Sequence, residues 1–424
     1  MHKIEPARFA AFVIYSSYCG AFYALPFIFY LTLGTPLEKE FVWRPSYELG
    51  IVFAAFSVYF FWLLCKFNVP ILILSRRNFK LNYLRKIYVF LFFILSTIFL
   101  LVSVSIYDDV GINFRHSGQE LNSLGGKGFL HLLLNEFLFV YVVSAISYIN
   151  AVKNSAVHIF FLKMSGLVCF VGFTITLQTA MGFIYCLASI QLVFTRHKDF
   201  GFTPIQVGRL LKEAGFVSVF ILLPMVLLGS ANKYEGGITY FLGTFSGAFD
   251  VISYLLERFS YRLGFHFYSL SELVTNSYLD LEKQILAISE QAKLILYRAS
   301  LLTGGSYERP ELGSVARINF VSMNGGYADR TGTTPSLLGS LFFLPGGILM
   351  FPIFMYACYS VVYRTAIVAM THNTGSLGIL YSIVIISAIL DSLLDTLNPF
   401  SSGFVSIVAL VLFAHFVKRN RRES

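Results

Sequence analysis

Arginine and histidine at four-residue intervals mark the part of the sequence best suited to binding an anion. Arg258, Arg262 and His266 project from one face if a helix continues through Gly264. Two guanidinium groups one helical turn apart can hold a diphosphate through bidentate hydrogen bonds, which lysines do less well. A helix face solvated by water explains the same spacing, so the pattern leaves both interpretations open.

A second region with suitable chemistry runs from Thr303 to Gly347 and is rich in glycine, serine, threonine and asparagine. Its Thr-Thr-Pro-Ser run before Leu337 predicts a helix start, with a hydroxyl cap, proline in the first turn and apolar residues after it. A helix N-terminus attracts anions such as phosphate. The hydroxyl groups of this run belong to Thr333, Thr334 and Ser336.

Two further cations, Arg317 and Arg330, lie in the same region, and Asp329 adjoins Arg330. The arginines extend the possible anion site. A salt bridge within the loop explains the Asp329–Arg330 pair, and the glycines of the region can simply form turns.

Carboxylates also occur within or beside apolar runs, at Glu136, Asp391 and Asp395. An ionisable residue inside a membrane span indicates a functional group by default. For Glu136 the alternatives are a direct role and an ion pair with a buried cation. Asp395 lies close enough to the end of its run for hydration alone to explain it.

Other catalytic motifs are missing from the sequence. It has no GxxxxGKS/T, HExxH, GxSxG or CxxC motif, and its five cysteines lie in apolar runs without metal-ligand spacing. We therefore expect neither a metal site nor another cofactor. We find no cytoplasmic domain large enough for a nucleotide sugar or ATP, so a transferase of this kind must take its donor from the membrane.

The composition predicts the elements that position these groups. The 424 residues are 56% hydrophobic and only 13% charged, about half of the roughly 25% usual for soluble domains. This excludes a disordered chain and a soluble domain. The net charge of +9 does not indicate a nucleic-acid partner, because the basic residues lie in short segments between apolar runs. We predict an all-α polytopic membrane protein.

A membrane span needs about 20 mainly apolar residues, which gives about ten spans. The first has no small-residue cleavage site after it, which favours a retained helix. The fifth and sixth form one apolar stretch that we divide at Gln178. The predicted spans are Phe9–Leu33, Tyr47–Cys65, Ile87–Ile106, Phe129–Ile149, Val157–Leu177, Thr179–Phe194, Ala214–Gly229, Leu337–Tyr363, Ser376–Leu394 and Gly403–Val417.

The positive-inside rule predicts the orientation of these spans. With the N-terminus inside, the inside segments carry eighteen lysines and arginines and the short outside loops carry four, which places both termini in the cytoplasm. The chain then divides into spans one to seven (1–229), a large outside loop (230–336) and spans eight to ten (337–424). Apolar residues at intervals of three and four predict helices within 247–302. Loops of this length are usually functional.

The region from Arg317 to Gly347 resembles the Wzy-type oligosaccharide repeat-unit polymerases of bacterial O-antigen and capsule assembly. In that family a large periplasmic loop ends in a similar Thr/Pro/Ser-x-x-G stretch that leads into a glycine-containing helix, and the arrangement of spans is alike. The features that carry the resemblance are Arg317-Ile-Asn, Asn324-Gly-Gly, the run from Gly332 to Gly339 and Gly346-Gly347.

The resemblance implies a metal-independent, GT-C-like glycosyltransferase of the bacterial inner membrane. It would join undecaprenyl-diphosphate-linked oligosaccharides at the periplasmic face, among membrane lipids and with a flippase and a chain-length regulator as partners. Arginines would stabilise the charge growing on the leaving diphosphate. These cations would be Arg258, Arg262, Arg317 and Arg330. The base for the acceptor hydroxyl would be His266, which shares the arginine face, or else Asp329 or Glu272.

The sequence leaves two other functions open, and it separates the first of them poorly from a polymerase. An O-antigen ligase uses the same kind of donor and a similar loop but transfers to lipid A–core. A lipid-linked oligosaccharide flippase is not an enzyme and usually has short loops, so the large loop counts against it.

Overall fold

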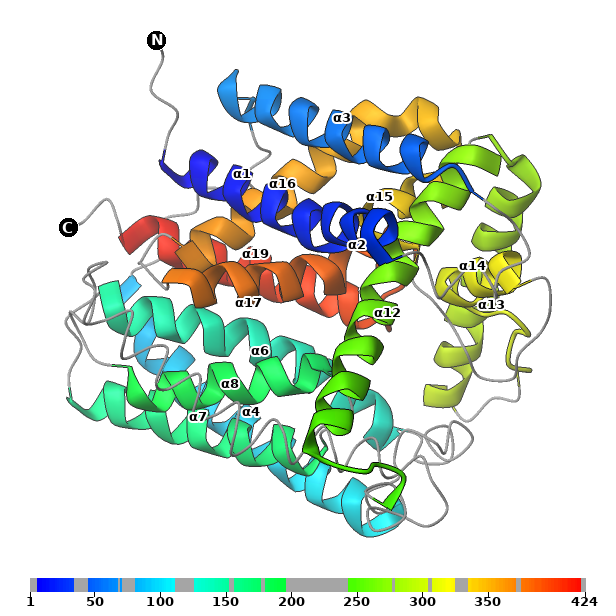
Figure 1. The fold of residues 1–424 in the computed structure, drawn as a ribbon. Helices are drawn as coiled ribbons and strands as arrows, with labels where there is room; N and C mark the ends of the chain where they lie inside the picture. Colours follow the sequence, from blue (N-terminus) through cyan, green and yellow to red (C-terminus); the bar gives the residue numbers. More distant parts are fainter. Residues whose placement is uncertain are drawn as a thin grey trace. The chain divides into compact units, whose positions relative to one another are not determined.

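The computed structural model describes residues 6–33, 45–67, 69–70, 81–110, 126–151, 156–176, 180–195, 243–276, 279–303, 307–324, 335–370 and 375–420. Over these ranges the chain is helical and contains no strand, as the composition predicted (Figure 1). The chain forms two compact units. Unit 1 comprises 1–72, 252–366 and 382–408, and unit 2 comprises 73–251, 367–381 and 409–424.

Six of the helices are long and apolar enough to cross a membrane, and they correspond to six of the predicted spans. Three predicted spans, the sixth, ninth and tenth, contain shorter apolar helices. The seventh predicted span, Ala214–Gly229, lies outside the described residues. The six long candidates are Ala7–Thr32, Tyr47–Lys66, Val89–Asp109, Gly126–Ile146, Ala156–Ile175 and Gly347–Ala366.

Four helices pack together in unit 2. They are α4 (Leu81–Val110), α6 (Gly126–Ala151), α7 (Ala156–Ile175) and α8 (Ala180–Phe194). The end of α7 and the start of α8 agree with the predicted division near Gln178. Small residues allow close approach, as is common between membrane helices: a Cβ on Gly172 would lie 2.6 Å from the Phe99 ring, and one on Gly166 would lie 3.2 Å from Leu192.

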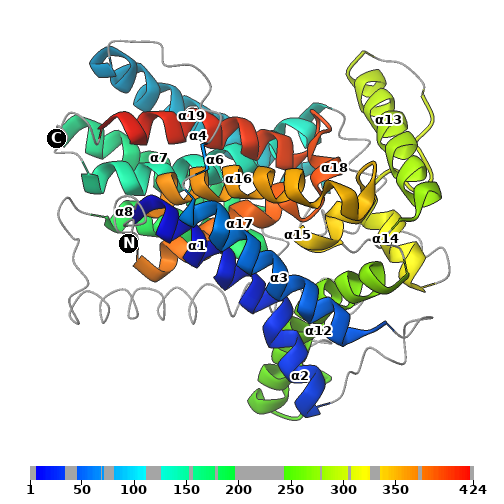
Figure 2. The same cartoon turned by 90° about the horizontal axis from the view of Figure 1, so that it is seen from above.

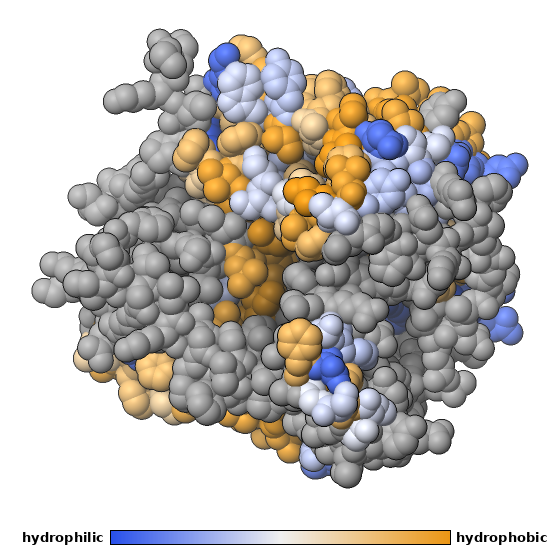
Figure 3. All heavy atoms as spheres, in the orientation of Figure 1, coloured by the Kyte–Doolittle hydropathy of each residue, from blue (hydrophilic) through white to orange (hydrophobic). Residues whose placement is uncertain are grey.

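Unit 1 begins with two helical spans. The first comprises α1 (Pro6–Cys19), a π-helical turn (Gly20–Ala24) and α2 (Leu25–Leu33), and the second is α3 (Tyr47–Lys66). Tyr15 joins them, because its ring stacks on Phe61 with centroids 4.1 Å apart and its hydroxyl donates to Ser57 at 3.0 Å. Leu49, Val52 and Phe56 of α3 are exposed, and Figure 3 shows apolar side chains on the surface where Figure 1 places this helix.

The segment predicted as a large outside loop is mostly helical where it is described. Two long helices, α12 (Ala248–Asn276) and α13 (Leu281–Thr303), confirm the periodicity found within 247–302. A third helix, α14 (Val315–Asn324), lies in the region whose glycine, serine and threonine content predicted only a loop. Apolar residues of α14 account for the difference, because Val315, Ile318 and Met323 are buried in unit 1.

The predicted eighth span was wrong at its start. The chain instead forms α15 (Ser336–Gly339) and a 3₁₀ turn (Ser340–Phe343), and α16 (Phe351–Met370) begins only after a break. Positive φ angles of 87° at Gly346 and 51° at Gly347 interrupt the helix, and these are backbone conformations that glycine adopts without steric cost.

The predicted ninth span also ends early. Helix α17 (Gly375–Leu390) stops before Asp391, and a separate turn of helix, α18 (Leu393–Thr396), follows it. The chain then enters α19 (Ser402–Asn420). Gly403 lies close to the end of α17 and to this turn, because a Cβ there would be 2.7 Å from the carbonyl oxygen of Ala388 and 3.1 Å from the Cβ of Thr396.

Candidate functional site

The turn between α17 and α18 gathers buried polar groups of unit 1. The carboxylate of Asp391 accepts a hydrogen bond of 2.5 Å from the Tyr18 hydroxyl, and that hydroxyl accepts one of 3.4 Å from the Leu337 N–H. The turn, α1 and the start of α15 are therefore tied together by one carboxylate and one phenol.

Ser336, a residue of the predicted helix start, has an unusual backbone. Its φ of 69° is the one positive value of a non-glycine residue in the described ranges, a conformation that costs roughly 1–2 kcal/mol. Its buried hydroxyl accepts from Tyr23 at 3.1 Å, and the Tyr23 hydroxyl accepts from the Leu338 N–H at 3.1 Å. Strain of this kind concentrates at functional sites.

The expected hydroxyl cap is not found at this helix start. Pro335 occupies the capping position and forms no side-chain cap. The N–H groups of Leu337 and Leu338 already donate to tyrosine hydroxyls, so an anion would have to displace these tyrosines to reach them. Thr333 and Thr334 lie outside the described residues.

Asp395 is bonded to protein groups, in contrast to the hydrated carboxylate that its position suggested. It accepts hydrogen bonds from the Val315 N–H at 3.0 Å, from the Ser392 hydroxyl at 2.6 Å and from the Gln291 amide. Burial raises the pKa of this carboxyl group, although these hydrogen bonds and nearby Arg298 act in the opposite direction. Asp395 thus joins α13 and the start of α14 to the turn.

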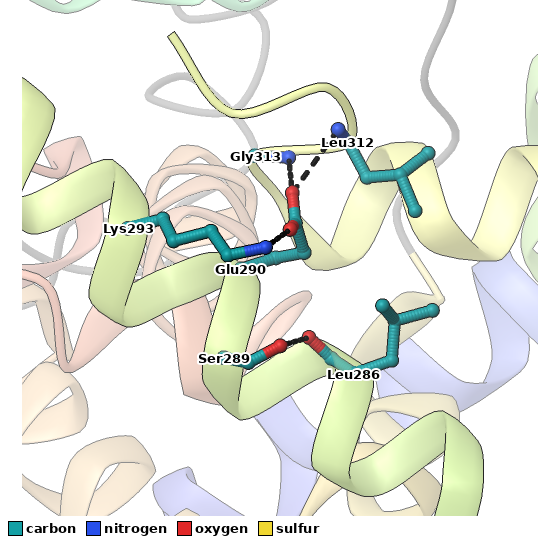
Figure 4. Close-up of polar contacts among 6 residues, drawn as sticks. All are labelled: Leu286, Ser289, Glu290, Lys293, Leu312 and Gly313. Carbon is teal, nitrogen blue, oxygen red and sulfur yellow. Dashed lines mark hydrogen bonds and ion pairs between the residues drawn. The ribbon is translucent and has the colours of Figure 1, made fainter. Parts of the chain in front are cut away.

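A second carboxylate, Glu290 of α13, holds the chain just before α14 (Figure 4). One of its oxygens accepts from the N–H groups of Leu312, at 3.1 Å, and Gly313, at 2.9 Å, and the other pairs with Lys293 at 2.7 Å. Burial alone would raise the pKa of Glu290, but these hydrogen bonds and Lys293 outweigh it and lower the pKa.

Arg317, predicted to bind diphosphate, lies on α14 just after the backbone groups that Glu290 and Asp395 hold. Its Nε is buried and has no hydrogen-bond partner among the described residues. The helix is fixed again two residues later, because Ser269 of α12 donates to the Asn319 side chain at 3.1 Å. The structure therefore holds an arginine on a well-anchored helix and leaves its buried N–H available for an acceptor.

Glu272, one of the three predicted bases, lies on α12 one turn after Ser269. Only 3% of its surface is exposed, and its Oε2 has no hydrogen-bond partner among the described residues. Burial raises the pKa of this carboxyl group, with Lys283 opposing and Asp280 adding to the shift. A carboxylate with a raised pKa is a stronger base than an ordinary one.

The other predicted residues are less completely described. Helix α12 continues unbroken through Gly264, so its backbone places Arg258, Arg262 and His266 on one face, as the spacing required. His266 packs edge-on against Phe22 with ring centroids 4.9 Å apart. The side chains of Arg258 and Arg262, and all of Asp329 and Arg330, lie outside the described residues.

The sequence analysis missed a partly buried cation, Arg298 of α13. Its guanidinium donates to the Phe400 carbonyl oxygen at 2.7 Å. Burial lowers its pKa, with Asp395 opposing and Arg309 adding to the shift. No second cation lies one turn away on α13, so helical spacing gave no signal for this residue.

Glu136 lies in unit 2 and pairs with a tyrosine hydroxyl. It is 8% exposed, and it accepts a hydrogen bond of 2.7 Å from the Tyr185 hydroxyl. In the described part of the chain, no group of three histidine, cysteine, aspartate or glutamate side chains could hold a metal ion.

Comparison with known protein families, curated proteins and solved structures finds no match to this chain.

Proposed function

We propose that this protein is a metal-independent glycosyltransferase that polymerises oligosaccharide repeat units carried on undecaprenyl diphosphate. The proposal extends to the topology: about ten spans in the bacterial inner membrane, both termini in the cytoplasm and residues 230–336 as a periplasmic loop. The resemblance of residues 317–347 to Wzy-type polymerases and the six membrane-spanning candidates support it.

The position of Arg317 is the observation that carries the proposal. A buried N–H without a partner costs about 1–3 kcal/mol, and a bound phosphate oxygen would remove that cost with a charge-assisted bond. Glu290, Asp395 and Ser269 anchor the chain on both sides of Arg317. The backbone that carries the guanidinium is therefore held in place before substrate arrives. Such preorganised charge is the most effective form of electrostatic catalysis.

The reaction needs a cation and a base. The bond between the donor's anomeric carbon and its diphosphate oxygen breaks, and the acceptor hydroxyl oxygen forms the new glycosidic bond. Arg317 would stabilise the charge that grows on the diphosphate, together with Arg258, Arg262 and Arg330. The hydroxyl proton would pass to His266, Asp329 or Glu272. The raised pKa of Glu272 suits it to this step.

Incubating the purified protein with a synthetic lipid-diphosphate repeat unit, without metal or nucleotide, tests the proposal. A ladder of longer lipid-linked chains is the expected result. Transfer that appears only when lipid A–core is added would identify a ligase instead. Absence of transfer in both reactions, with delivery of the lipid-linked unit across vesicle membranes, would identify a flippase.

A further inference from the structure

Helix α13 exposes its apolar side chains. Leu281, Ile285, Ile288 and Leu296 recur at helical spacing, and 63%, 66%, 40% and 50% of their respective surfaces are exposed. Ala292, also exposed, fills the gap between the last two. These five residues, here called the α13 stripe, form a continuous apolar band along most of the helix.

The buried face of α13 is mostly polar, with Ala287 among its apolar members. Gln284, Glu290 and Gln291 are 2%, 4% and 5% exposed. Glu290 bonds to the chain before α14, Gln291 bonds to Asp395, and Gln284 accepts from the Gly346 N–H at 3.1 Å. The side chains of α13 that bind the rest of unit 1 are therefore largely hydrophilic.

This arrangement reverses that of a helix on a water-soluble protein, which turns its apolar stripe to the core and its polar residues to water. Apolar side chains gain nothing from facing water, so a helix with this pattern requires an apolar environment on its outer side. The inverted pattern points to a surface that the folded chain itself does not cover.

The neighbouring elements identify that environment as lipid. The bond between Gln284 and Gly346 places α13 beside the start of the membrane-spanning candidate Gly347–Ala366. Leu349 and Ile353 near the start of that candidate span are 74% and 62% exposed. Figure 2 shows α13 near α14 and α18. The α13 stripe and the exposed start of this candidate span therefore lie on neighbouring elements.

Charged residues beside the stripe fit the same environment. Glu282 and Lys293 are exposed next to the apolar band, and Lys293 pairs with Glu290. A long charged side chain such as Glu282 at this position can reach the headgroup region while the apolar face enters the lipid. A contact with the hydrocarbon boundary accommodates both kinds of side chain.

We propose that α13 is an interfacial helix whose stripe of Leu281, Ile285, Ile288, Ala292 and Leu296 lies in the outer part of the lipid bilayer. This contact would hold the α12–α14 region at the membrane surface. It is independent of the proposed transferase activity, because it depends only on the exposed and buried faces of one helix.

Site-directed fluorescence in lipid vesicles tests the contact. The full-length protein would carry a single environment-sensitive label at Ile285→Cys, Ile288→Cys or Leu296→Cys, with Lys293→Cys as the matched control on the charged side. The native cysteines in the described ranges are buried, and unmutated protein measures their residual labelling. Phosphatidylcholine–phosphatidylglycerol vesicles, with and without lipids doxyl-labelled near the headgroup, provide the quencher.

The labels on the stripe are expected to emit at shorter wavelength than the label at position 293. Doxyl lipids should quench them at least twofold more strongly. Emission typical of water at all three stripe positions would overturn the proposal. Short-wavelength emission without doxyl quenching would also overturn it, because that result means that protein covers the stripe.

Discussion

Replacing Glu290 with alanine tests how the chain that carries Arg317 is held in place. Glu290 is the partner of the Leu312 and Gly313 N–H groups, at 3.1 and 2.9 Å. An unpartnered buried N–H costs about 1–3 kcal/mol, and one of these two groups is only partly buried. We therefore expect Glu290→Ala to destabilise the folded position of residues 307–324 by about 3 kcal/mol. The equilibrium constant for local unfolding of this segment should rise roughly 100-fold.

Two control variants separate the hydrogen bonds from the charge. Both N–H groups bond to the same carboxylate oxygen, so Glu290→Gln can keep both bonds through its single amide oxygen. Charge-assisted bonds are about twice as strong as neutral ones, and we expect a cost of about 1 kcal/mol, or roughly fivefold. Lys293→Ala removes a pair whose lysine is 61% exposed, so its cost is at most about 1 kcal/mol.

Hydrogen–deuterium exchange of peptides covering residues 307–324 measures these effects directly. The expected order of exchange rates is Glu290→Ala far above Glu290→Gln, with Lys293→Ala closest to the unmodified protein. Equal exchange in Glu290→Ala and unmodified protein would refute the assignment of Glu290 as the anchor of this segment.

Three further predictions concern stability. Burial raises the pKa of Glu272, so its charged form destabilises the fold as the pH rises above the ordinary pKa of a carboxyl group. Glu272→Gln should therefore raise the unfolding temperature at pH 7, and this gain should vanish below about pH 4. An equal gain at both pH values would contradict this. Because φ at position 336 is 69°, the Ser336→Gly protein should be more stable than the Ser336→Ala protein by about 1 kcal/mol in denaturant unfolding, the reverse of the ordinary helix preference. Greater stability of the alanine variant would show that this backbone is not strained. Gly403→Ala places a Cβ 2.7 Å from the Ala388 oxygen and should lower stability by about 1–3 kcal/mol in a thermal melt; an unchanged melting temperature would contradict the close packing.

The sequence predicted the class of fold and most of its helices because apolar runs and helical periodicity are local signals. It did not predict the break before α16, although Pro345, Gly346 and Gly347 carried a signal for it. The span criterion counts apolar residues and gives little weight to single glycines. Helix α14 was missed for the opposite reason, since its apolar residues lie within a stretch rich in turn-forming residues.

The candidate site was predictable only in part. Arg317 and Glu272 were proposed as candidates from residue type and from the resemblance, and their roles remain predictions. The groups that hold the chain around Arg317 were not predicted, because Glu290 binds backbone N–H groups 22 and 23 residues away and Asp395 binds the Val315 N–H across 80 residues. Contacts of this range leave no periodic pattern, and backbone partners leave no pattern in side-chain type.

The rate of chain extension by Arg317→Ala protein is the most direct test of the proposed transferase. Removing one preorganised group that stabilises transition-state charge costs about 10²–10³ in rate, so we expect a loss of this size. The melting temperature should not fall, because the variant also removes a buried N–H without a partner. Arg317→Lys should recover part of the rate, since it retains the charge but not the planar donor group. Extension of lipid-linked chains by Arg317→Ala at the unmodified rate would contradict the central role of this arginine.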